Sequence, residues 1–283
     1  MNHNLEASPV IKAFRLLSHL AHSDRPAGLA ELSRALNLPK PTVHRLASML
    51  GEIAVVHKDP VSAHYSLGPG FEDMALGALH NGVGALPRRA LMDQLSERLG
   101  VRINFTVLRA GKVTYVQWVE STSVLRVDLK EDTQVPVHCS ASGKLLMAHA
   151  PADVQARFLK SAPFAPRTKK TITTAKALMR EFKTIRRAGY SIDNEEFLQG
   201  VVCLAVPVRD RSGNVVAGLA VMAPQASFPL AKARRHLPDI QHCAEMISSQ
   251  FGRRAEGAAR RGQGARNGTA ATESRGEGAP PRV

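Results

Sequence analysis

The chain has 283 residues, 44% of them hydrophobic, so it has room for about two domains with packed cores. It contains no apolar run of about 18 residues, and its first residues lack the basic-then-apolar pattern of a secretion signal. Its cysteines, Cys139, Cys203 and Cys243, include no CxxC pair, which argues against a disulfide framework or a cysteine zinc site. We therefore expect a cytoplasmic protein with no membrane contact, no metal and no cofactor.

The formal net charge of +14 is distributed unevenly along the chain. Residues 1–84 carry 7 basic and 7 acidic residues, residues 85–252 carry 24 and 14, and residues 253–283 carry 7 and 3. The basic excess therefore lies outside the first 84 residues. The net charge therefore does not indicate that residues 1–84 bind nucleic acid, and any prediction of binding there depends on the pattern of residues.

The segment from Gly28 to Leu50 predicts two short amphipathic helices joined by a tight turn. Apolar residues recur at helical spacing in both halves: Leu29, Leu32, Ala35 and Leu36, then Val43, Leu46, Ala47 and Leu50. Pro39 disfavours a helical conformation at Leu38, and Pro41 suits the first turn of the second helix. The pattern is that of a helix-turn-helix, whose second helix enters the DNA major groove.

The polar face of the second helix is the candidate DNA-binding surface. It carries Lys40, Thr42, His44, Arg45 and Ser48. Arg45 and His44 can donate hydrogen bonds to bases, and Lys40 and Thr42 to phosphates or bases. An ordinary three-helix bundle without a role in DNA binding is the alternative.

Two flanking segments complete the expected domain. A preceding helix is expected to bury Val10, Ile11, Phe14, Leu17 and Ala21. A strand over 53–56, an Asp59-Pro60 turn and a return strand over 64–67 predict a hairpin, or wing. The wing would bring His57, Lys58 and His64 near the DNA backbone or minor groove.

Residues 71–83 predict a connecting helix, with Phe71, Met74, Ala75 and Leu79 on one side. The helix ends in Asn81-Gly82, a turn pair, and we place the domain boundary at Gly84. Two interpretations of its apolar face stay open. The face packs against a second copy of the chain, or it is buried on its own domain.

The remainder predicts an α+β domain followed by a tail. Helices are expected over 86–100, 140–150, 152–160, 174–188 and 232–251, and strands over 103–108, 113–119, 124–129, 201–208 and 215–222. Helices that flank hairpins indicate a mixed or antiparallel sheet. The last residues are rich in Gly, Ala, Arg and Pro without periodicity, which predicts a disordered basic tail.

The helix that begins after Ser140 is a candidate anion site. Ser140 can cap the helix, and the first free amides and the helix dipole favour an anion there. Ala141 and Gly143 leave the backbone open to a ligand. A plain capped helix is the alternative.

Several segments resemble the IclR family of bacterial transcriptional regulators. They are PKPTVHRL, the hairpin end YSLG, VPVHCSASGKLLMA, and GYSIDNEEFLQGVVCLAVPVRDRSGNVVAGLAV. The resemblance covers about residues 8–251 and leaves out the tail over 252–283. It implies an α+β protein with a winged helix-turn-helix domain over 8–70, a linker helix over 71–84 and a GAF-like effector-binding domain over 85–251. It also implies a homodimer or dimer of dimers on a palindromic double-stranded DNA operator. Such a regulator controls a catabolic operon in response to a small carboxylic acid, and an activator would recruit RNA polymerase.

The same resemblance indicates the effector site. Ala141 and Ser142 match the ligand-contacting loop, and Asp193, Val201 and Cys203 match other pocket positions. On the final strand, some members carry small polar residues where this chain has Ala220 and Met222. This difference argues against a very small oxoacid and favours a larger, partly apolar acid such as an aromatic carboxylate.

Parts of the sequence are also compatible with two other functions. An enzyme would use Cys203 with His138, or Asp193 with Glu195 and Glu196, on a small carboxylic acid. A nucleophilic cysteine needs a nearby histidine and a lowered pKa, whereas Cys203 lies in an apolar strand. We expect Asp193 to line the pocket, Glu195 and Glu196 to be solvated, and the chain not to be an enzyme. The third function is general nucleic-acid binding through the basic tail.

Overall fold

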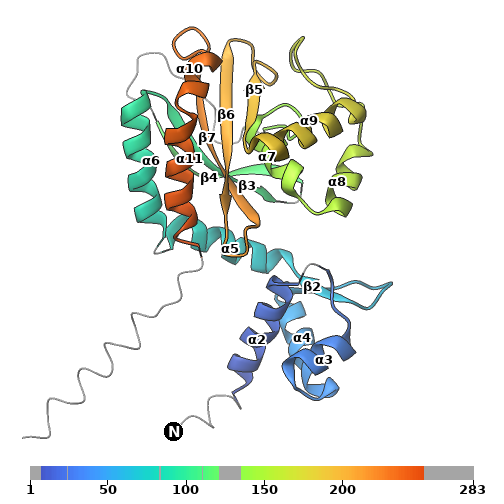
Figure 1. Cartoon of the computed structure of the whole chain (residues 1–283). Helices are drawn as coiled ribbons and strands as arrows, with labels where there is room; N and C mark the ends of the chain where they lie inside the picture. Colours follow the sequence, from blue (N-terminus) through green and yellow to red (C-terminus); the bar gives the residue numbers. More distant parts are fainter. Residues whose placement is uncertain (1–7, 24, 83, 110, 121–134, 252–283) are drawn as a thin grey trace, which may run out of the picture. The chain divides into compact units, whose positions relative to one another are not determined.

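The computed structural model describes residues 8–23, 25–82, 84–109, 111–120 and 135–251, and Figure 1 shows the elements. The chain divides into two compact units, Met1–Ala90 and Leu91–Val283. Within the described ranges, no helix combines the length and hydrophobicity needed to cross a membrane.

The first unit contains a helix-turn-helix followed by a hairpin, as the sequence predicts. Its elements are α2 (Pro9–Ala21), α3 (Leu29–Leu36), α4 (Lys40–Glu52), β1 (Val56–Lys58), β2 (Tyr65–Leu67) and α5 (Pro69–Asn81). Asn37 ends α3 in the left-handed conformation, with φ of 52°. The Ser33 hydroxyl donates to the Leu38 carbonyl at 2.6 Å, and Pro41 lies in the first turn of α4. The turn is therefore fixed both by its own hydrogen bonds and by the prolines that follow.

The structure corrects the predicted buried face of α2. Leu17 is buried as expected, but Val10 and Phe14 are 61% and 64% exposed. Ile11 and Ala21 are exposed as well. The helix instead buries Leu16, Leu17 and Leu20, on which α3 and α4 pack. Two apolar stripes adjoin on α2, and α3, α4 and the hairpin cover only one of them.

The hairpin begins later than the sequence predicts. Strand β1 starts at Val56, whereas Ile53 and Ala54 form a turn in which Ala54 has φ of 57°. A Cβ on Gly68 would lie 2.2 Å from the Ala54 carbonyl oxygen, so only glycine allows the end of β2 to approach this turn. The β1–β2 turn is closed by Asp59, whose Oδ1 accepts from the Ser62 amide at 2.6 Å.

The second unit is an antiparallel sheet with helices on both faces (Figure 1). Its helices are α6 (Ala85–Leu99, which starts within the first unit), α7 (Ala141–His149), α8 (Ala152–Leu159), α9 (Ala175–Ala188), α10 (Leu230–Arg235) and α11 (Leu237–Ser248). Its strands are β3 (Arg102–Arg109), β4 (Lys112–Val119), β5 (Ser191–Asn194), β6 (Val201–Arg209) and β7 (Val215–Pro224), in the order β4-β3-β7-β6-β5. Helix α7 packs on one face of β6 and β7, and α11 covers the other face. The prediction of an α+β unit with an antiparallel sheet is confirmed.

Two local predictions in this unit are wrong. The single helix expected over 232–251 is divided into α10 and α11, because Pro238 cannot continue a helix and instead lies in the first turn of α11. Strand β5 was not predicted, since its four residues include Ser191 and Asp193 and lack a hydrophobic pattern. The strand expected over 124–129 and the tail over 252–283 lie outside the described residues.

Helix α9 provides a test of the second core. Phe182 is 1% exposed among residues of α7 and the sheet, so Phe182→Ala should lower the free energy of unfolding by about 3–5 kcal/mol. Met179 lies on the same helix but is 47% exposed, so Met179→Ala should change it by less than about 0.5 kcal/mol. Urea unfolding of the full chain measures both, and equal effects would contradict the packing described.

Candidate functional site

Helix α4 presents a polar face on the side opposite its buried residues. Val43, Leu46 and Ala47 point into the core. The predicted DNA-binding residues of α4 are exposed or, for Thr42, half-buried: Lys40, Thr42, His44, Arg45 and Ser48. Within the described ranges, none of these side chains makes a hydrogen bond or an ion pair. The face is therefore available to a partner without breaking internal contacts.

The hairpin adds a second basic position. Lys58 is exposed at the end of β1, and its ammonium lies 5.6 Å from the centre of the Tyr65 ring. His57 is exposed beside it, whereas the His64 ring donates a hydrogen bond from Nδ1 to the Ser62 carbonyl oxygen at 2.8 Å. Lys58 and His57 can therefore reach a partner, while His64 is held within the turn.

The first turn of α7 is tightly built. The Ser140 hydroxyl accepts from the Gly143 amide at 3.2 Å and donates to the Pro136 carbonyl at 2.7 Å, so the predicted cap is present. A Cβ on Gly143 would lie 2.5 Å from the Val137 Cα, so glycine is required here by close packing. Ala141 and Ser142 follow the cap and are buried.

The strand register brings most of the predicted effector residues onto the sheet face below α7. Met222 pairs with Cys203, which pairs with Asp193. Two residues along, Ala220 pairs with Ala205. These positions share a face because side chains alternate along a strand, and Cys203, Ala205 and Ala220 pack in the same core cluster as Ala141. Val201 lies on this face as well, half-buried at the edge beside Pro224.

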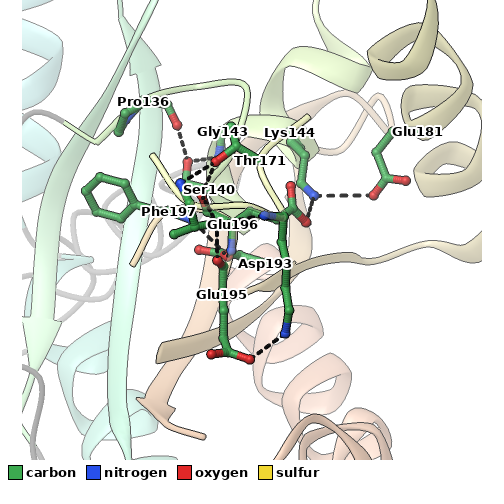
Figure 2. A network of polar contacts seen from close by, with 12 residues as sticks. Pro136, Ser140, Gly143, Lys144, Thr171, Glu181, Asp193, Glu195, Glu196 and Phe197 are labelled. Atoms are coloured by element: carbon green, nitrogen blue, oxygen red, sulfur yellow. Dashed lines mark hydrogen bonds and ion pairs between the residues drawn. The ribbon is translucent and has the colours of Figure 1, made fainter. Parts of the chain in front are cut away.

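A buried ion pair joins α7 to the turn that follows β5 (Figure 2). Lys144 is 0% exposed, and its Nζ lies 2.5 Å from Glu196 Oε1 and 3.4 Å from Glu181 Oε1 on α9. Asp193 Oδ1 accepts from the Glu196 amide at 2.7 Å. Lys144 was not singled out from the sequence, and the expectation that Glu196 is solvated is wrong. A lysine between apolar helical neighbours gives no sign of its partner, which lies 52 residues away.

The same turn is anchored from outside. Thr171 Oγ1 donates to the Glu196 carbonyl at 2.6 Å, and Thr168 Oγ1 donates to the Glu195 carbonyl at 2.7 Å. Glu195 is half-buried and pairs with Lys170 at 2.6 Å, so it also is not simply solvated. These contacts hold Asp193 and Glu196 in fixed positions beside the first turn of α7.

Burial makes the acidic groups of this site weak acids. It raises the pKa of Asp193 to about 7, with an opposing contribution from the Glu196 amide hydrogen bond. It also raises the pKa of Glu196 despite the attraction of Lys144. Two further buried polar atoms, Ser191 Oγ and Glu196 Oε2, have no hydrogen-bond partner in the described part of the chain. The site therefore contains a weakly acidic Asp193 carboxyl and buried polar atoms without partners, which can accept or donate hydrogen bonds.

Neither member of the Cys203–His138 pair is prepared for nucleophilic catalysis. Burial raises the pKa of the Cys203 thiol, which keeps it protonated and a poor nucleophile. His138 is stacked on Phe164, with its Nε2 3.0 Å from the Ala165 carbonyl oxygen. Over the described ranges, no group of three or more His, Cys, Asp or Glu residues could hold a metal ion.

Comparisons with known proteins match both units. The family model "Bacterial transcriptional regulator IclR C-terminal" matches residues 87–249, and "IclR helix-turn-helix domain" matches residues 9–60. The chain is 33% identical to the "Probable transcriptional regulator SauR" of Cupriavidus necator, over 88% of this chain and 98% of that protein.

Solved structures share the fold. An IclR-family regulator from Rhodococcus sp. aligns with a TM-score of 0.66 at 25% identity, over 86% of this chain and 92% of that one. An IclR homolog from Microbacterium hydrocarbonoxydans, solved with 4-hydroxybenzoate, aligns with a TM-score of 0.53 at 22% identity, over 86% and 98%.

Asp193 predicts a pH dependence of stability. Its pKa is about 7 when folded against an ordinary value of 3.8, so its favourable contribution is complete below about pH 4 and is lost as the pH rises through 7. Asp193→Asn keeps an acceptor oxygen but cannot ionise. Between pH 5 and pH 8, the variant should gain about 2–3 kcal/mol of unfolding free energy relative to wild type.

Denaturant unfolding at the two pH values measures this difference. The exposed Asp153 provides the control variant, Asp153→Asn. Its unfolding free energy should change between pH 5 and pH 8 by the same amount as that of wild type. A parallel profile for Asp193→Asn would contradict the assigned burial.

Proposed function

Because the chain belongs to the IclR family of bacterial transcriptional regulators, we propose that it binds a palindromic operator as a homodimer and responds to a small organic acid. Like the relatives named as transcriptional regulators, it is a DNA-binding regulator and not an enzyme. We assign DNA binding to residues 8–70, the linker helix to 71–84 and effector binding to 85–251. The buried polar residues beneath the first turn of α7 are the observation that supports an effector most directly.

The unpaired polar face of α4 supports its role as the recognition helix. Arg45 and His44 are placed to donate to base edges in the major groove. Lys40, Thr42 and Ser48 would contact phosphates or neighbouring bases, and Lys58 would contact the backbone from the wing. Because the first 84 residues carry no net charge, each half-site binds modestly, and two half-sites on a dimer supply the affinity.

Exposed apolar residues support the homodimer. Val10, Ile11 and Phe14 on α2 and Met74 on α5 are large hydrophobic side chains that the first unit leaves in solvent. Of the predicted apolar face of α5, Phe71 packs on this unit's core. A second copy would cover these side chains, and a dimer of dimers would use the same contact twice.

The effector would lie between the first turn of α7 and the sheet. Its carboxylate would meet Ser140, Ala141 and Ser142 at the helix N-terminus, where the dipole favours an anion. Asp193 would accept from a hydroxyl group. The remaining wall is formed by Val201, Cys203, Ala220 and Met222. This mostly apolar wall suits an aromatic acid, the class to which the 4-hydroxybenzoate of the Microbacterium homolog belongs.

Effector binding would act on DNA through the linker. Contacts of the ligand with the first turn of α7 and with the turn after Asp193 would change packing through α5, and hence the spacing of two recognition helices. A coupling of about 1–3 kcal/mol suffices for such a switch. The target would be a catabolic operon in the cytoplasm, and contact with RNA polymerase would apply if the chain is an activator.

A gel shift on the DNA upstream of the protein's own gene tests this function. We expect a salt-sensitive shift that resists competitor DNA and that benzoate-type acids alter more than two-carbon acids do. A chain truncated after Phe251 should keep its sequence-specific binding. Loss of specificity on truncation would favour tail-driven binding, and turnover of an acid without any specific shift would favour the enzyme.

Arg45 provides the test of base reading. Arg45→Ala should weaken operator binding by about 1–3 kcal/mol more than it weakens binding to scrambled DNA. Arg45→Lys keeps the charge but loses the bidentate geometry, so it should keep nonspecific affinity and lose discrimination. Fluorescence anisotropy at one salt concentration measures both DNAs. Equal losses on the two DNAs would assign Arg45 to the phosphate backbone.

A further inference from the structure

An arginine lies on the same sheet face as the predicted effector residues. Arg102, at the start of β3, pairs in register with Met222, so Arg102, Met222, Cys203 and Asp193 form one row across four strands. Arg102 is 7% exposed. The resemblance to the family did not indicate this position, and the alternating pattern of β3 gave no sign that its first residue is buried.

The guanidinium of Arg102 is oriented by its neighbours but has donors to spare. Its Nε donates to Asn104 Oδ1 at 2.9 Å, and its Nη1 donates to Glu120 Oε1 at 2.6 Å. Its Cζ lies 6.0 Å from the centre of the Tyr115 ring and 5.7 Å from that of Trp118. As far as the described residues go, its Nη2 donates to no protein acceptor. An arginine carries five N–H donors in a planar fork that matches a carboxylate.

The acid that pairs with Arg102 is not buried with it. Glu120 is 40% exposed at the end of β4, whereas the arginine is almost fully enclosed. Exchanging Glu120 for another carboxylate would keep the guanidinium paired and return Glu120 to solvent. Burying an arginine without an anion is costly, so an acid that replaces Glu120 is strongly preferred to a neutral ligand.

We propose that Arg102 binds a second acidic group of the effector in place of Glu120, and that the effector is therefore a diacid. This inference rests on the proposed function, which places the first carboxylate at the first turn of α7. Helix α7 packs over β6 and β7, and only β7 separates β6 from β3. The backbones of β6 and β3 are thus about 10 Å apart. Because the Arg102 side chain extends from β3, the distance that a ligand must span is shorter than this. That span suits two acid groups joined by a short chain or one aromatic ring.

Shape-matched acids test the proposal on the full chain. The probes are terephthalate against 4-methylbenzoate, and the diacids from succinate to adipate against the monoacids of equal chain length. Affinity is measured by calorimetry and by the shift of the melting temperature. We expect the best diacid to bind wild type at least about tenfold more tightly than its monoacid partner. A tenfold difference in affinity is what one well-placed charged contact contributes.

Variants then assign the preference to Arg102. Arg102→Met should bring the diacid to the affinity of its monoacid, and Arg102→Lys should keep only part of the preference because it lacks the planar fork. Glu120→Gln removes the competing carboxylate, so diacids should bind it several-fold more tightly than wild type. The control is Arg98→Met, which breaks the exposed Arg98–Asp239 pair of the same unit and should leave the preference unchanged.

The outcomes separate this inference from the function on which it rests. If monoacids bind wild type as tightly as diacids, or if Arg102→Met retains the diacid preference, the second acid site is wrong and the effector proposal stands. If no acid of either series binds or alters operator binding, the effector proposal itself fails. The comparison of acids on wild type needs no variant, so a misfolded Arg102→Met does not prevent the test.

Discussion

The site in the second unit depends on the buried ion pair between Lys144 and Glu196. The lysine is fully enclosed within α7, and its partner belongs to the turn after β5, so one 2.5 Å contact sets the distance between helix and turn. Losing one partner of a buried pair leaves an uncompensated charge, at a cost of about 3–5 kcal/mol. Because Asp193 accepts from the Glu196 amide, its position depends on the same pair.

Local sequence patterns were sufficient to predict the elements whose conformation depends on neighbouring residues. The two prolines and the left-handed Asn37 locate the turn between α3 and α4, and the apolar spacing locates both helices. The same reasoning failed for α2, because two apolar stripes adjoin there and periodicity does not say which one meets a neighbour. Burial on that helix is decided by its packing on α3 and α4, which the periodicity of α2 itself does not contain.

The site was only partly predictable, for a similar reason. The capping role of Ser140 can be predicted from the sequence, because a cap residue bonds amides within the next turn of the helix. Arg102 and Lys144 are not, since their partners are defined by strand register and by a distant turn. A bulge in the β3–β4 pairing also makes the surroundings of Arg102 hard to predict. Tyr115 and Trp118 both lie beside Arg102, although a regular strand would direct them to opposite faces.

The pairing of β3 with β7 has a kinetic consequence. Residues 102–106 meet residues 218–222 only after more than a hundred intervening residues are in place, so the closing contact is strongly non-local. The β3–β4 and β6–β7 hairpins can form early, each from a continuous stretch of chain. During synthesis, the row that joins Arg102 to Asp193 forms only once β7 has left the ribosome. The proposed effector site is therefore one of the last parts of this unit to be completed.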